Sequence, residues 1–144
     1  MSANDSEPTR AVNPEPQVFS QDPEVNVLIQ NLFGVSETHL AGNERVPEEN
    51  LGYEVRSKIS NINMSYRFFD RKVPGKGPEV RRQFVRDAMD GINTLYLNNS
   101  KYPKLLRDEL TQEMRDLVSS DKFDLFWYAK EKENEWNKPT KNNN

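Results

Sequence analysis

The chain has 144 residues, of which 34% are apolar and 30% are charged, and its net charge is −3 at pH 7. This length and composition fit one domain with a modest core, and they lie above the range of wholly disordered chains. Cysteine is absent and His39 is the only histidine, which excludes disulfide frameworks, thiolate nucleophiles and Cys-based zinc sites and leaves little for Ser-His or Cys-His catalysis.

The N-terminal part contains two predicted segments. Residues 1–21 are polar, acidic and interrupted by prolines, and they cannot bury enough apolar surface to offset the entropy of ordering, so we expect a disordered acidic arm. Residues 22–34 predict a short amphipathic docking helix, with Asp22 as cap, Pro23 at its first position and Gly34 at its end. Because so short a helix is marginal in water, it must dock onto the domain or onto a partner.

Residues 45–137 are predicted to form a helical domain. Pro47 can start a helix whose apolar positions keep one face as far as Phe69. The stretch 64–69 also alternates as an edge strand would, but a lone strand has no pairing partner, so we favour helix there.

The best-defined helix follows the break Val73-Pro-Gly-Lys-Gly-Pro78 and runs from Pro78 to about Asn98. Arg81 falls inside its apolar arc, so this side chain either reaches outward, pairs with an acidic residue of another helix, or points at an anionic partner. Gly91 offers a small patch for close approach of another helix, although a tolerated surface glycine fits the sequence as well.

Two further helices are predicted, over residues 102–118 and 121–136, followed by a disordered tail at 138–144. The last helix is apolar on two sides, so it must lie between two layers or cover a partner. One stripe holds Phe123, Phe126 and Trp127, and the other holds Leu125, Ala129 and Trp136. The fold class is therefore predicted as all-α: a small bundle of four to five helices with a disordered acidic arm and a frayed C-terminal tail.

Charge is distributed unevenly along the chain. Residues 1–54 carry ten acidic and two basic side chains, a net of −8, whereas residues 67–86 carry seven basic and two acidic ones, a net of +5. This asymmetry bears on partners more than on fold. The basic residues, as candidates for binding an anion or nucleic acid, are Arg67, Arg71, Lys72, Lys76, Arg81, Arg82 and Arg86. Aromatic residues at 66, 68 and 69 could stack on bases beside them, but the same charges could instead pair with the acidic arm.

The sequence favours a non-enzymatic protein–protein interaction or assembly module. The predicted partner-binding residues, on the docking helix and near the C-terminus, are Val25, Leu28, Ile29, Leu32, Phe33 and Trp136. The partner would be another protein or a second copy of the chain. An accessory nucleic-acid binder is the first alternative, and an acidic inhibitor or mimic that competes for a basic surface is the second.

Other classes of function find little support in the sequence. Neither a metal-site spacing nor a phosphate-binding loop is present, so we expect no catalytic residue, metal, cofactor or small-molecule substrate. There is no signal peptide and no apolar run of the ~18–20 residues that a membrane span needs, which predicts an intracellular, by default cytoplasmic, protein without membrane contact.

Overall fold

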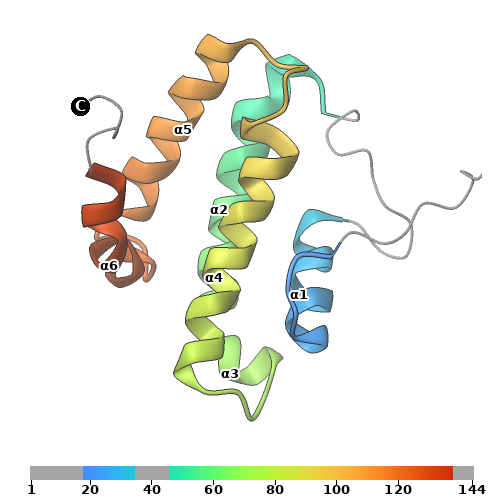
Figure 1. Ribbon diagram of the computed structural model, residues 1–144, viewed down its shortest axis with the longest axis vertical. Helices are drawn as coiled ribbons and strands as arrows, with labels where there is room; N and C mark the ends of the chain where they lie inside the picture. The colour runs from blue at the N-terminus through green and yellow to red at the C-terminus, as the bar shows by residue number, and fades with distance from the viewer. Residues whose placement is uncertain (1–17, 35–45, 138–144) are drawn as a thin grey trace, which may run out of the picture.

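The computed structural model describes residues 18–34 and 46–137, which form six α-helices and no strand (Figure 1). A 3-10 turn, η3, precedes α2, and a π-helical segment, η4, follows α4. In chain order the elements are α1 (Pro23–Phe33), η3 (Glu48–Asn50), α2 (Leu51–Arg67), α3 (Phe69–Lys72), α4 (Pro78–Ile92), η4 (Asn93–Leu97), α5 (Lys104–Val118) and α6 (Phe126–Asn137). The prediction of an all-α fold is confirmed.

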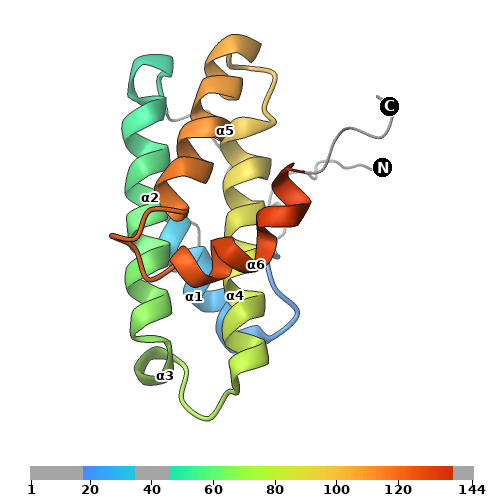
Figure 2. The same ribbon diagram turned by 90° about the vertical axis from the view of Figure 1, so that its left-hand side faces the viewer.

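Helices α2 and α4 form the centre of the bundle and run antiparallel to each other (Figure 1). Helix α1 packs against both of them on one side, and α5 and α6 lie on the other side. Figure 2 shows α6 crossing the bundle at an angle to α4 and α5. The buried side chains of all these helices make one continuous apolar core.

The short helix α1 docks onto its own domain. Its cap is the predicted one, because the Asp22 carboxylate accepts the backbone N–H groups of Glu24 and Val25 at 3.0 and 3.2 Å. Gly34 ends the helix in the left-handed region, at φ 74°, where glycine carries no steric penalty. The apolar face of α1 packs on α2 and α4, so residues 22–34 belong to the bundle.

Residues 18–21, which the sequence assigned to the disordered arm, lie folded back along α1 in the structure. The Asn26 side-chain oxygen accepts the backbone N–H groups of Phe19 and Ser20, at 2.6 and 3.0 Å, and so folds this stretch back along α1. The Phe19 ring then lies 5.2 Å from the ring of Phe33. The predictions for residues 1–17 and for the tail at 138–144 fall outside the described residues.

Helix rather than strand is confirmed for residues 64–69. The Phe68 N–H donates to the Met64 carbonyl at 3.1 Å, which continues the helical pattern to the end of α2. A short turn, α3, follows, and its Phe69 side chain is fully buried against Phe84 of α4, with 5.5 Å between the ring centroids.

The central helix, α4 continued by η4, ends at Leu97 with Asn98 as its cap, close to the predicted end at about Asn98, but its last turn is a π-helix. A π-turn is wider than an α-turn, and here three consecutive side chains, Leu95, Tyr96 and Leu97, are buried. Gly91 is the site of close approach: a Cβ atom there would lie only 2.7 Å from the ring of Phe33. The absence of a side chain at 91 is what lets α1 reach α4.

The last helix starts later than predicted. Residues 121–125 form turns, and α6 begins at Phe126 instead of Asp121. The Asn63 side chain of α2 accepts the Leu125 N–H at 3.1 Å, which satisfies a donor just ahead of the helix and fixes where the chain enters it. Because these two residues are 62 positions apart, no local sequence pattern predicts this hydrogen bond.

Gly91→Ala should lower the free energy of unfolding by about 1–2 kcal/mol, because the overpacking against Phe33 outweighs the gain in helix propensity. Gly52→Ala is a matched control within α2: its added Cβ meets the movable guanidinium of Arg56 at 3.3 Å and makes an ordinary van der Waals contact with Leu110 at 3.6 Å. The control should leave stability unchanged or raise it by up to about 1 kcal/mol. Urea denaturation of both variants measures the difference, and equal effects would contradict the close approach.

Candidate functional site

The predicted partner-binding residues of α1 lie inside the domain. Val25, Ile29 and Phe33 are 0–5% exposed, and Leu28 and Leu32 are partly buried against the core. A partner could reach the three buried side chains only if α1 left the bundle. The small core takes up the apolar face that the sequence suggested for a partner.

Trp136 also packs against the core. Its side chain is half-buried beside α5, where it lines a small hollow of about 210 Å³ together with Gln112, Arg115 and Asp116. The structure therefore leaves only part of this indole for a partner.

Lys76 joins the loop before α4 to the start of α1. Its ammonium group forms ion pairs with Glu24 at 2.9 Å and Asp22 at 3.0 Å. The hydrogen bonds with Glu24 and Asp22 raise the pKa of Lys76, and the hydrogen bond from Lys76 lowers the pKa of Asp22. Lys76 of the basic segment is therefore paired with two acidic side chains at the start of α1.

Arg81 binds a backbone carbonyl. Its Nε and Nη2 both donate to the Tyr66 carbonyl oxygen, at 3.0 and 2.8 Å, and its guanidinium lies 4.1 Å from the centre of the Tyr66 ring. Of the alternatives that the sequence left open for Arg81, an acidic partner on another helix is not the contact that it makes. Carbonyls in the last turn of a helix lack intrahelical donors, and Arg81 supplies two to one of them in α2.

The remaining basic residues have separate surroundings. Arg67 pairs with Asp124 at 2.8 Å, Arg71 lies 5.2 Å from the Phe68 ring, and Arg82 reaches Glu79 at 3.5 Å. Lys72 is exposed, and Arg86 donates to Gln83 and borders a hollow beside the second half of α6. The seven basic side chains therefore do not gather around one site.

A groove lies where the end of α2, the start of α4 and the turn into α6 meet. We call it the aromatic groove, and its volume is about 690 Å³. Five aromatic side chains and four charged ones line it: Tyr66, Phe68, Phe123, Phe126, Trp127, Arg67, Arg81, Asp121 and Asp124. Two features that are far apart in the sequence, the beginning of the basic segment and the aromatic C-terminal part, thus come together.

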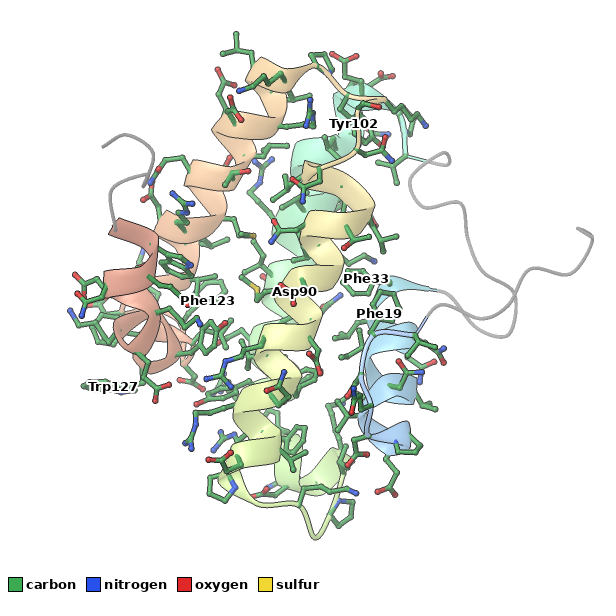
Figure 3. All side chains as sticks on the ribbon, in the orientation of Figure 1. Phe19, Phe33, Asp90, Tyr102, Phe123 and Trp127 are labelled. Atoms are coloured by element: carbon green, nitrogen blue, oxygen red, sulfur yellow. The ribbon has the colours of Figure 1, made fainter. Side chains whose placement is uncertain are left out.

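Trp127 is the exposed aromatic side chain among those that line the aromatic groove, with 68% of its surface accessible. Its ring stands edge-on to that of Phe126, with the centroids 5.2 Å apart. Figure 3 places Trp127 and Phe123 on the α6 side of the molecule, away from Phe19 and Phe33. The sequence put Trp127 in one stripe with Phe123 and Phe126, and the later start of α6 breaks that stripe.

A second hollow, of about 640 Å³, lies between residues 18–25 and α4. Its aromatic members are Phe19, which is half-buried, and Phe84, which is fully buried. Neither offers an exposed ring, so the aromatic groove is the stronger candidate for an interaction site.

Neither a metal-binding cluster nor a membrane-spanning helix occurs among the described residues. No group of three or more His, Asp or Glu side chains in residues 18–34 and 46–137 could hold a metal ion. Within the same ranges, no helix combines the length and apolar character that crossing a bilayer requires.

Arg81→Ala should lower the free energy of unfolding by about 2 kcal/mol, because it removes two charge-assisted hydrogen bonds and a cation–π contact from the joint between α2 and α4. Arg82→Ala is the control on the same helix, since Arg82 forms only a long pair with exposed Glu79. It should change stability by less than about 0.5 kcal/mol. Thermal and urea unfolding of both variants test this, and an equal loss would contradict the assigned role.

Tyr128 reports the docking of α6. Burial raises the pKa of the Tyr128 phenol to about 12 from its ordinary value of 10.0. Since the pKa of Tyr128 is higher in the folded state than in the unfolded state, the neutral phenol makes its full contribution to stability below about pH 10. This contribution is lost as the pH rises through about 12. The tyrosinate absorbance of the native chain should show an increase near pH 12, and Tyr128→Phe should make that increase smaller. It should not abolish the late increase, because burial also raises the pKa of Tyr102. Tyr53→Phe is the control, because Tyr53 is 70% exposed. A late increase of the same size in Tyr128→Phe and in the native chain would contradict the assignment.

No family model, no curated protein and no solved structure matches this chain. Its function has to be inferred from its own geometry.

Proposed function

We propose that this chain is a non-enzymatic protein–protein interaction module that binds its partner in the aromatic groove. The observation that carries the proposal is the exposed indole of Trp127 at a groove of about 690 Å³. Tryptophan and tyrosine dominate binding energy at protein interfaces when a pocket of the partner desolvates them. An exposed tryptophan beside four further aromatic residues is the composition that we expect of such an interface when its partner is absent.

The partner-binding surface then lies in the aromatic groove and not on α1. The sequence alone suggested the apolar face of α1, but burying Val25, Ile29 and Phe33 already stabilises the bundle. Removing them from the core to bind a partner would cost the domain that stabilisation. The aromatic groove needs no such rearrangement, because Trp127 is accessible in the folded state.

A protein partner suits the charges of the groove better than nucleic acid does. Its lining carries Arg67 and Arg81 but also Asp121 and Asp124, so the formal charges cancel. Nucleic-acid binding draws most of its affinity from a net positive surface that releases counterions. Lys76 and Arg67 are moreover engaged in ion pairs within the chain.

Trp127→Ala should weaken capture of the partner by about tenfold or more, because a buried tryptophan is among the commonest interface hot spots. Leu105→Ala is the matched control: Leu105 is 72% exposed, but it lies at the start of α5 and does not line the groove. Affinity capture from the source cells with immobilised native chain and both variants, quantified by mass spectrometry, measures the effect. Equal recovery on the native chain and on Trp127→Ala would rule out the groove as the interaction surface.

A further inference from the structure

The aromatic groove holds both parts of a self-complementary contact. Trp127 projects from it with 68% of its surface exposed, and the groove itself has room for an aromatic side chain. In a two-fold dimer each subunit uses the same patch, so a residue that is inserted on one side is received on the other. A chain with an exposed indole next to an aromatic groove meets this condition by itself.

The charges at the groove also favour a self-complementary contact. Arg67 and Asp124 form an ion pair at 2.8 Å whose side chains are 48% and 53% exposed, so each can also face outward. Such an exposed pair contributes little to the stability of the single chain, and its members can exchange partners at small cost. A strongly acidic or strongly basic partner would meet like charges in this groove, whereas a second copy presents the opposite charge for each member of the pair.

We propose that the occupant of the aromatic groove is a second copy of this chain. In the resulting two-fold dimer, Trp127 of each subunit inserts into the other subunit's groove, and Arg67 of each faces Asp124 of the other. The net charge of −3 per chain is small enough for two copies to associate without strong repulsion. The inference rests on the proposed function and names the partner of the same surface.

The first experiment measures association of the purified full-length chain by sedimentation equilibrium between about 1 and 200 µM, a range that brackets micromolar dissociation constants. The native chain should show a reversible monomer–dimer equilibrium. Trp127→Ala should raise the dissociation constant by about tenfold or more, and Leu105→Ala should leave it unchanged. A native chain that stays monomeric throughout, or a dimer that Trp127→Ala does not weaken, would overturn the proposal.

The second experiment tests the two-fold pairing through charge. Arg67→Asp and Asp124→Arg each place like charges opposite one another in a homodimer, so each variant alone should associate more weakly than the native chain. When the two variants are mixed, every introduced charge faces its opposite across the axis, and association should recover. Unchanged melting curves establish that both variants are folded, as the exposure of the two positions leads us to expect. A mixture that associates no better than the separate variants would overturn the pairing.

The two proposals fail in different ways. If the native chain is monomeric but captures another protein only when Trp127 is present, the interaction module stands and self-association is wrong. If capture is also independent of Trp127, both proposals are wrong. A dimer that needs Trp127 supports both.

Discussion

The antiparallel pair of α2 and α4 is the contact on which the rest of the structure depends. Its apolar faces, including fully buried Ile59, Ile62, Phe84 and Ile92, form the middle of the core, and the other long helices attach to its two sides. Arg81 fastens the pair at one end, because it gives two hydrogen bonds to a carbonyl in the last turn of α2. A modest core leaves no amphipathic face to spare, so α1 packs on this pair and α6 packs on the neighbouring α5.

This demand for apolar surface also decides which side chains remain for function. Helix α1 fills one side of the central pair, where Gly91 lets the Phe33 ring approach α4. On the other side α6 buries Tyr128 and Ala129 and leaves Trp127 in solvent. An indole that the core does not use, next to a groove with mixed charges, is the feature from which we infer an interaction module and its self-association.

Much of the fold could be predicted because local signals set it. Asp22 and Gly34 delimit α1, and Pro78 opens α4, each through a preference that acts within one helical turn. The candidate site could not be predicted in the same way. Residue types at 67, 81 and 127 were conspicuous in the sequence, but their meeting in one groove depends on the path of residues 121–125, which a side chain of α2 holds.

The sequence by itself determined the helical class, the approximate limits of most helices and the uneven charge, because periodicity, capping and composition are properties of neighbouring residues. Only the tertiary structure decided which apolar face is buried and which aromatic ring stays exposed. In the folded chain, Asn26 accepts hydrogen bonds from the backbone of residues 19 and 20, and Asn63 accepts one from the residue before α6. Arg81 donates to the Tyr66 carbonyl. In each of these contacts a side chain satisfies a backbone polar group. Packing decides which backbone group the side chain reaches, and local sequence patterns do not encode that packing.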